Sequence, residues 1–294
     1  MRRTISRIAA VTVAIAAATA TFGGSLAAAA EASPGACRAG TLYLTFDTGS
    51  MSQAELIART LRKHHIRATF FLANEPTINK DSSLDPGWAP FWKSLAADGH
   101  AFGTHTFDHV YLRSVKGDKV TMRPQFGAQG GKDVVMTEAT FCTELRRSAQ
   151  ALQSMTGQPM VPLWRAPGGR TAPQTLAWAE QCGFKHVGWA PAGFLGDELS
   201  SEKFPNQALL DKALRDLRDG DITMAHLGIW SRKDPWAPAV LEPLISGLEQ
   251  KGFCFATLRE HPQYKNWIAQ RGLVQTGAQS QSSTQSSATS GSKR

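Results

Sequence analysis

Short apolar segments alternate with amphipathic segments along most of this chain, and this alternation constrains its fold more than any other feature. Residues 41–46 and 68–73 are rich in β-branched and aromatic residues and predict buried strands. Residues 52–65 and 137–155 have the periodicity of amphipathic helices. Further strands are expected at 101–104, 161–164, 185–189, 222–225 and 253–257, and further helices at 85–97, 172–182, 206–218 and 238–251. About seven strand–helix units in succession favour a mostly parallel α/β sheet, either open and doubly wound or closed into a barrel.

One long stretch does not follow this alternation. Residues 110–136 show no clear helical period and contain Gly127, Gly130 and Gly131. A long segment of this kind inside a compact domain predicts an irregular loop that could act as a lid.

The two ends of the chain differ from the α/β part. Residues 1–30 combine an arginine-containing start, an apolar stretch and an alanine-rich end, which is typical of a secretory signal peptide. An uncleaved membrane anchor is the alternative, because residues 8–30 carry no charge. Residues 271–294 are rich in Ser, Gln and Thr and predict a disordered tail. Residues 31–270 remain, about 240 residues, which is the size of one large domain.

Export would place the four cysteines in an oxidising compartment, periplasmic or extracellular, where disulfides form. Four cysteines allow three pairings. We expect Cys37–Cys254, because Cys37 precedes the first strand and Cys254 lies in the last, and these strands become neighbours if the sheet closes. Cys142 and Cys182 lie in consecutive predicted helices and form the second expected disulfide.

Composition excludes several classes of protein. Hydrophobic residues make up 42% of the chain and charged residues 19%, which excludes a wholly disordered protein. No second long apolar segment follows the leader, so no stable membrane span is expected after its cleavage. The formal net charge of +8 includes no run of Lys or Arg of the kind that tracks phosphates, so no nucleic-acid partner is expected.

Four polar residues stand where predicted strands end. They are Asp47 after Leu-Thr-Phe, His105 after Phe-Gly-Thr, Arg165 after Pro-Leu-Trp and His226 after Thr-Met-Ala. The carboxyl ends of parallel strands open on one face of the sheet, where the catalytic sites of α/β folds lie. A single buried His or Asp is most often satisfied by the backbone, but four at equivalent positions predict a shared site.

A second histidine, His109, stands four residues after His105 in the segment His-Thr-Phe-Asp-His. One helical turn would place both imidazoles on the same side, as two ligands of a divalent ion. Asp108, inside this segment, is expected to point away from the site as a loop cap.

In this order, the motifs resemble those of the NodB-type polysaccharide deacetylases, carbohydrate esterase family four. The similar segments are Thr45-Phe-Asp-Thr-Gly49 for T-F-D-D-G, His105 to His109 for H-[ST]-x-x-H, Arg165-Ala-Pro-Gly-Gly169 for R-x-P-[FY]-[GN], and the strand ending at His226 for L-x-H. The resemblance extends over residues 40–261. It implies a distorted (β/α)7-type barrel and metal-dependent removal of acetyl groups from the N-acetylated sugars of a polysaccharide or peptidoglycan-type substrate.

The resemblance also implies a role for each matching residue. Asp47 would be the general base and His226 the general acid, while Arg165 would orient and tune Asp47. His105 and His109 would bind the divalent metal, for which zinc is the expected ion.

Three further residues are candidates for binding the substrate. Backbone N–H groups near Gly168 would stabilise the oxyanion of the reaction. Trp189 and Trp230 follow strand ends, where their rings could pack on sugar rings, although buried tryptophans mostly belong to the core.

Three positions depart from the family pattern. Thr48 stands where the family has its third metal ligand, an Asp, so that a neutral hydroxyl replaces a carboxylate. Gly168 stands where the third motif has an aromatic residue. Residues 190–197 contain no carboxylate matching the family's fourth motif, D-x-x-D-W. Arg165 would then lack its usual partner, and Asp197 is interpreted as a solvated loop residue.

The departure at residue 48 leaves several alternatives open. Asp47 could become the third ligand, the two histidines could hold the metal together with water or Thr48, or the site could have lost catalysis and kept binding. The expected function is a polysaccharide N-deacetylase. The alternatives are a carbohydrate-binding pseudoenzyme of the cell envelope and a deacylase acting on a non-sugar amide.

Overall fold

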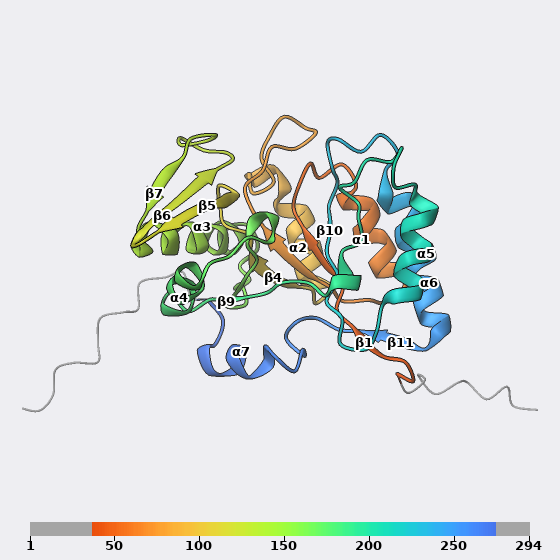
Figure 1. Ribbon diagram of the computed structural model, residues 1–294. Helices are drawn as coiled ribbons and strands as arrows, with labels where there is room; N and C mark the ends of the chain where they lie inside the picture. Colours follow the sequence, from red (N-terminus) through yellow and green to blue (C-terminus); the bar gives the residue numbers. More distant parts are fainter. Residues whose placement is uncertain (1–36, 275–294) are drawn as a thin grey trace, which may run out of the picture. The chain divides into compact units, whose positions relative to one another are not determined.

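The structure is a computed structural model that describes residues 37–274. The expected signal peptide lies outside this range, and so does the expected tail beyond Val274. None of the helices within the range combines the length and apolar character that crossing a bilayer requires. In chain order the elements are β1 (Gly40–Leu42), β2 (Thr45–Asp47), α1 (Ala54–Lys63), β3 (Thr69–Leu72), η1 (Pro86–Trp88), α2 (Ala89–Ala97), β4 (Ala101–Thr104), β5 (Val110–Lys116), β6 (Lys119–Pro124), β7 (Val134–Met136), α3 (Glu138–Thr156), β8 (Leu163–Trp164), η2 (Pro167–Gly169), α4 (Pro173–Gln181), β9 (Lys185–His186), η3 (Pro191–Gly193), α5 (Asn206–Asp216), β10 (Ala225–His226), η4 (Ala237–Leu241), α6 (Glu242–Lys251), β11 (Phe253–Phe255) and α7 (Lys265–Arg271) (Figure 1).

A six-stranded parallel sheet forms the centre of the fold, in the order β10-β2-β3-β4-β8-β9. The predicted strand at 41–46 is divided, so that β2 belongs to this sheet while β1 pairs in parallel with β11. Every residue of β3 is buried, as expected for a strand covered on both faces. The predicted mostly parallel α/β architecture is therefore confirmed.

The sheet closes through an irregular segment rather than a seventh regular strand. Residues 190–195, which follow β9, run beside residues 222–224, which precede β10. The backbone N–H of Met224 donates to Gly193 O at 2.8 Å, and the N–H of Leu195 donates to Met224 O at 3.2 Å. A Cβ atom on Gly193 would lie 2.1 Å from Ile222 O, so glycine permits this close approach. This closure corresponds to the expected distorted barrel.

Side chains fill the barrel and close its lower end. The inner cluster contains Phe71 of β3, Leu163 of β8 and Val187, which directly follows β9, together with Leu258 and Tyr264 from the chain after β11. The N–H of Leu258 donates to Thr69 Oγ1 at the start of β3. The chain after β11 thus covers the end of the barrel opposite the carboxyl ends of the strands, where the site is expected.

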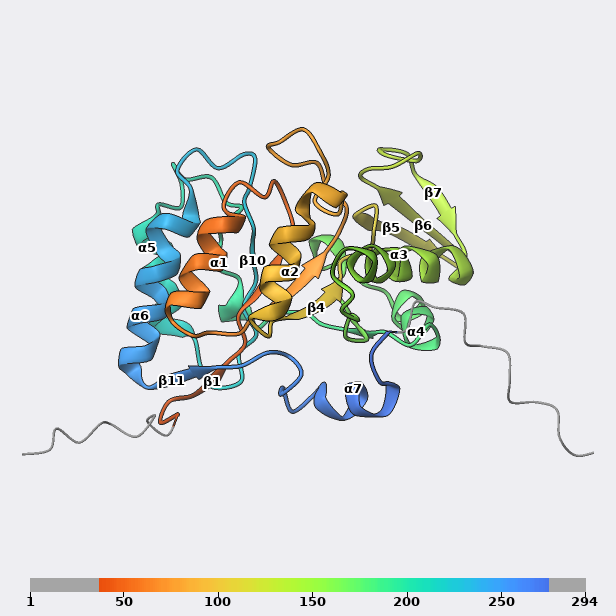
Figure 2. The same ribbon diagram turned by 180° about the vertical axis from the view of Figure 1, so that it is seen from behind.

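Helices surround the strands on the outside (Figures 1 and 2). In chain order, α3 packs between α2 and α4, and α5 packs against α6. The largest hydrophobic cluster lies between the strands and these helices, and includes Trp92 of α2, Ile57 of α1 and Leu244 of α6. Helix α7 was not predicted. It packs below the barrel, where Trp267 Nε1 donates to Pro162 O at 3.0 Å.

The prediction of an irregular loop at 110–136 is wrong. Strands β5, β6 and β7 form a three-stranded antiparallel sheet there. The residues Val110, Leu112, Val120 and Met122 are buried against Phe141 and Leu145 of α3, while the residues between them are more exposed. This alternation is that of a strand with one covered face, and the three glycines occupy only the β6–β7 connection.

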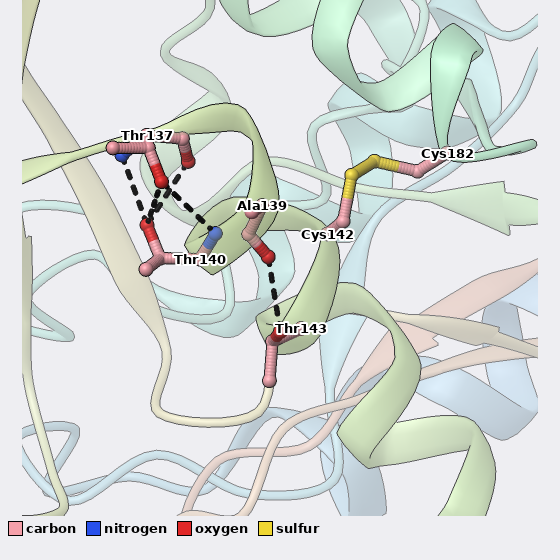
Figure 3. Close-up of a disulfide and its surroundings, with 6 residues drawn as sticks. All are labelled: Thr137, Ala139, Thr140, Cys142, Thr143 and Cys182. Carbon is pink, nitrogen blue, oxygen red and sulfur yellow. Dashed lines mark hydrogen bonds between the residues drawn. A yellow bond between two sulfur atoms is a disulfide. The ribbon is translucent and has the colours of Figure 1, made fainter.

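Both expected disulfides are present. Cys37–Cys254 joins the start of β1 to β11, and Cys142–Cys182 joins α3 to the residue that follows α4. Figure 3 shows the second disulfide beside the first turns of α3. There Thr137 caps the helix, because its Oγ1 accepts a hydrogen bond from the N–H of Thr140.

The two disulfides are expected to contribute unequally to stability. Cys37–Cys254 encloses a sequence separation of 217 residues and Cys142–Cys182 one of 40. The longer loop restricts the unfolded chain more, so Cys37→Ser/Cys254→Ser should lose about 1.5 kcal/mol more free energy of unfolding than Cys142→Ser/Cys182→Ser. Urea unfolding of the two double variants measures this difference, and equal losses would contradict the chain-entropy explanation.

Candidate active site

A cavity of about 450 Å³ opens at the carboxyl ends of the barrel strands. Most of the polar residues predicted from the strand ends line it, together with both substrate-contact tryptophans. Its lining includes Asp47, Glu75, His105, His109, Tyr111, Gly168, Trp189, Glu198, His226 and Trp230. Two predicted residues, Arg165 and Thr48, lie directly behind this lining and contact it through hydrogen bonds.

Asp47 and Arg165 form a buried ion pair beneath the cavity. Nη1 of Arg165 donates to Asp47 Oδ1 at 2.9 Å, and both side chains are shielded from solvent. No carboxylate other than Asp47 pairs with this guanidinium in the described chain. Instead, Nε and Nη2 donate to Val187 O at 3.4 Å and Gly188 O at 3.3 Å, and the guanidinium lies 4.3 Å from the centre of the Phe71 ring. Burial lowers the pKa of Arg165, and Asp47 opposes this effect.

His105 is oriented by a backbone carbonyl. Its Nδ1 lies 3.0 Å from Arg165 O, which can only accept, so Nδ1 carries the proton and Nε2 presents a lone pair. Nε2 lies 3.6 Å from Asp47 Oδ2. Burial and the neighbouring His109 hold the pKa of His105 well below its ordinary value. The ring is therefore neutral, which is the form in which histidine binds metal ions.

His109 lies beside His105, with 4.9 Å between the ring centres. Burial lowers its pKa, although Glu75 opposes the shift. Its Nδ1 is buried and has no hydrogen-bond partner. Two neutral imidazoles thus adjoin each other at one side of the cavity.

The segment joining the two histidines is a tight turn rather than the helical turn that the spacing suggested. Thr106 has φ 61° and His109 has φ 50°, both in the left-handed region. The turn is fastened to α3 by Arg147, whose Nη1 contacts Asp108 Oδ2 at 2.8 Å and Glu144 Oε1 at 2.7 Å. Asp108 therefore points towards α3, as expected of a residue that caps the loop. Backbone strain of this kind persists only where surrounding contacts hold it in place.

Glu75 is a cavity residue that sequence analysis missed. It follows β3, and its Oε1 accepts hydrogen bonds from Thr48 Oγ1 at 2.5 Å and from the N–H of Gly49 at 2.9 Å. Oγ1 of Thr48 also accepts a hydrogen bond from the N–H of Ala73 at 3.2 Å. Thr48, which departs from the family pattern, thus binds the carboxylate of Glu75, which follows the neighbouring strand β3.

The electrostatic surroundings keep Glu75 ionised. Burial acts to raise its pKa, but His109, His105 and its two hydrogen bonds outweigh burial, and the net pKa is lowered. The signal that could have found Glu75 was available, because Asn74 and Glu75 directly follow the predicted strand at 68–73.

His226 is held by Asp197, and the interpretation of Asp197 as a solvated loop residue is wrong. Asp197 is only 3% exposed. Its Oδ2 accepts a hydrogen bond from the backbone N–H of His226 at 2.7 Å and lies 3.1 Å from His226 Nδ1. Burial lowers the pKa of His226, but Asp197, with smaller contributions from Asp47 and Glu198, raises it to about 10. His226 is therefore an imidazolium at neutral pH.

The departure at Gly168 also has a structural counterpart. Gly168 has φ 61°, and a Cβ atom there would lie 2.7 Å from Cε1 of Tyr111. The ring of Tyr111, which comes from β5, thus occupies the space beside residue 168. Trp189 is half-buried in the cavity wall, whereas Trp230 is 64% exposed.

The side chains around the cavity are of the types that bind a divalent ion, although they do not meet at one point in this structure. Neutral His105 and His109 and the ionised Glu75 are nitrogen and oxygen ligands of the kind that zinc accepts, and the unpartnered Nδ1 of His109 shows that this ring is not fixed by a protein hydrogen bond. Between residues 37 and 274, however, no three His, Cys, Asp or Glu side chains lie close enough together to form a ready-made metal site. The residues fit a metal by their chemistry, and binding would require the side chains to move together.

The strand ends of this α/β barrel carry a buried carboxylate, Asp47, and an imidazolium, His226. These two groups are of the kind that act as base and acid in hydrolysis. The family model for polysaccharide deacetylases matches residues 35–187. This chain belongs to the polysaccharide deacetylase family.

Individual relatives agree with this assignment. The chain is 26% identical over 233 residues to a chitooligosaccharide deacetylase of Azorhizobium caulinodans, which covers 74% of this chain and 92% of that protein. The fold is similar to that of a crystallised peptidoglycan N-acetylglucosamine deacetylase, with a TM-score of 0.57, 21% identity, and coverage of 76% of this chain and 88% of the other. It is also similar to a pseudoenzyme of carbohydrate esterase family four from Bacillus anthracis, with a TM-score of 0.55, 16% identity, and coverage of 77% and 66%.

Asp197→Asn is expected to lower the pKa of His226 from about 10 towards its ordinary value or below it. The reason is that the variant removes the anion that opposes burial. Because the pKa of His226 is higher in the folded than in the unfolded protein, its protonation stabilises the fold. This stabilisation is complete below pH 6.5, the unfolded value, and is lost as the pH rises through about 10. At pH 7 the variant should therefore lose free energy of unfolding, by about 2 kcal/mol.

NMR titration of the His226 ring signals measures the pKa, and urea unfolding measures the stability. Glu198→Gln is the matched control, because Glu198 Oε2 lies farther away, 4.0 Å from His226 Nε2. Its effect on the pKa of His226 should be smaller. An unchanged pKa in Asp197→Asn would contradict the role given to Asp197.

Proposed function

We propose that this protein is a metal-dependent hydrolase that removes acetyl groups from the N-acetylated sugars of a polysaccharide or cell-wall glycan. One observation carries the proposal: a single cavity holds Asp47, bound by Arg165, and His226, bound by Asp197. Family membership supplies the chemical class of the reaction.

Asp47 is the general base in this proposal. Its Oδ1 accepts a hydrogen bond from Arg165, so Oδ2 is the oxygen that takes a proton from the attacking water. The buried guanidinium fixes the direction of the carboxylate during this transfer.

His226 is the general acid. Its Nδ1 faces Asp197, which leaves Nε2–H to protonate the departing amine nitrogen. The raised pKa keeps that proton in place at neutral pH, and an unprotonated amine anion would be a poor leaving group.

His105 and His109 are the proposed imidazole ligands of the divalent ion, with zinc as the expected metal. When bound, such an ion lowers the pKa of a coordinated water and polarises the acetyl carbonyl. The backbone around Gly168, at the cavity wall, is the proposed source of further N–H donors to the oxyanion.

A glycan substrate and action outside the cytoplasm are further parts of the proposal. The exposed ring of Trp230 and the half-buried ring of Trp189 offer apolar faces on which sugar rings can pack. The signal-like sequence of residues 1–30 and the two disulfides support export to the periplasm or medium.

Purified protein supplied with zinc, cobalt or nickel should release acetate from N-acetylglucosamine oligomers or from peptidoglycan. Asp47→Asn and His226→Asn should each lower kcat by about 10²–10⁴-fold, because each removes one proton-transfer group. Asp211→Asn, on the exposed face of α5, is the control and should keep full activity.

Other outcomes favour the two alternatives. Glycan binding without acetate release over a broad substrate panel would favour a carbohydrate-binding pseudoenzyme. Two observations motivate this alternative: Thr48 stands in place of a metal-binding Asp, and the fold is similar to that of a family pseudoenzyme. Hydrolysis of small amides but not of glycans would favour a non-sugar deacylase.

A further inference from the structure

We infer that Glu75, from the end of β3, supplies the carboxylate ligand of the divalent ion in place of residue 48. This inference rests on the proposed metal-dependent function. It concerns which residue of this chain supplies the negative charge that Thr48 cannot.

Thr48 is engaged in a way that explains its presence. Its hydroxyl donates to Glu75 Oε1 and accepts from the N–H of Ala73, so both hydrogen-bonding roles of the oxygen are used inside the protein. A hydroxyl bound on both sides is a poor metal ligand, but it is well suited to hold a carboxylate. Thr48 therefore positions Glu75 rather than replacing a ligand itself.

Glu75 keeps one oxygen available for a ligand. The bonds from Thr48 and Gly49 both end on Oε1, and none of the residues described donates to Oε2. The side chain lines the same cavity as His105 and His109. The cavity therefore holds two imidazoles and a carboxylate with one oxygen that accepts no hydrogen bond from the described residues.

Comparison of the acidic side chains in the cavity lining singles out Glu75. Three carboxylates belong to the lining: Asp47, Glu75 and Glu198. Asp47 is paired with Arg165 at 2.9 Å, and Glu198 faces the His226 imidazolium at 4.0 Å. Within the described part of the chain, the hydrogen-bond donors to Glu75 are the hydroxyl of Thr48 and the N–H of Gly49, and both are neutral. A carboxylate that has no cationic partner among the described residues and lines the same cavity as two imidazoles is the arrangement that a divalent cation would complete.

The relation between β2 and β3 explains how a glutamate can act from this position. The two strands are parallel neighbours, and the N–H of Thr48 donates to Phe71 O, so the chain after β3 runs beside residue 48. The side chain of Glu is one methylene longer than that of Asp, which gives it reach from the adjacent strand end. Since the donors do not converge in the present conformation, this extra torsional freedom is also what metal binding would use.

Zinc affinity of the chelator-stripped protein, measured by competition with a chromophoric chelator, tests the inference without recourse to activity. Glu75→Gln should bind zinc on the order of 100-fold more weakly. Gln can still accept both hydrogen bonds at Oε1, so the local fold is retained. Glu198→Gln removes the same charge from the same cavity and should change the affinity by less than about threefold, because a distant charge is only a weak contributor.

Two further variants separate a ligand from a remote charge. Glu75→Asp keeps the charge but shortens the side chain, and should also weaken zinc binding by at least about tenfold. Thr48→Asp/Glu75→Gln moves the carboxylate to residue 48 and should recover most of the lost affinity. Circular dichroism and thermal unfolding verify the fold, and Glu75→Asp provides the test if Glu75→Gln does not fold.

The possible results are distinguishable. Zinc binding by Glu75→Gln and Glu75→Asp at the affinity of the unmodified protein would overturn the inference while leaving the proposed function intact. Failure of the unmodified protein to bind zinc, cobalt or nickel would overturn the metal-dependent function as well. An equal loss in Glu198→Gln and Glu75→Gln would show a general effect of charge and would also overturn the inference.

Discussion

The buried ion pair between Asp47 and Arg165 is the interaction on which the rest of the cavity depends. It joins the ends of β2 and β8, and the backbone carbonyl of Arg165 in turn orients His105, which follows β4. Two further N–H groups of the guanidinium donate to the carbonyls of Val187 and Gly188, beyond β9. Removing either partner would leave an uncompensated buried charge, which typically destabilises a protein by about 3–5 kcal/mol. One pair therefore fixes the mutual positions of four strand ends.

Around this pair, the positions that depart from the family motifs are accompanied by residues from other parts of the chain. Glu75 lies against Thr48, and Tyr111 fills the space beside Gly168. Asp197, two residues after the irregular segment that closes the barrel, binds His226. Each residue that departs from the family motifs thus has a polar or aromatic side chain from another element beside it. The cavity is a site in which side chains of similar character approach from different elements, and this argues against simple decay of its chemistry.

The sequence predicts the parts of the site that depend on regular strands. Asp47, His105, Arg165 and His226 could be found because parallel strands deliver their last residues to one edge. Glu75 obeys the same rule and was recoverable. Asp197 was not, because its position depends on how residues 190–195 run beside 222–224, a tertiary arrangement with no local signal. The sheet at 110–136 was missed because glycines in one connection concealed the alternation of its strands, and β8, β9 and β10 are too short for periodicity to define their limits.

The antiparallel sheet β5–β6–β7 is separate from the central sheet and contributes Tyr111 to the lining of the cavity. Its apolar face packs on α3 and α4 rather than on the central strands alone, while Tyr111 at its base reaches Gly168. Among the strands of residues 37–274, β7 pairs with β6 alone, and its Val135 is 55% exposed. Changes in the length or the surface residues of β6 and β7 would not alter Asp47, Arg165 or His226, because these three residues lie at the ends of other strands. The surface beside the cavity can therefore vary during evolution while the residues at the strand ends stay the same.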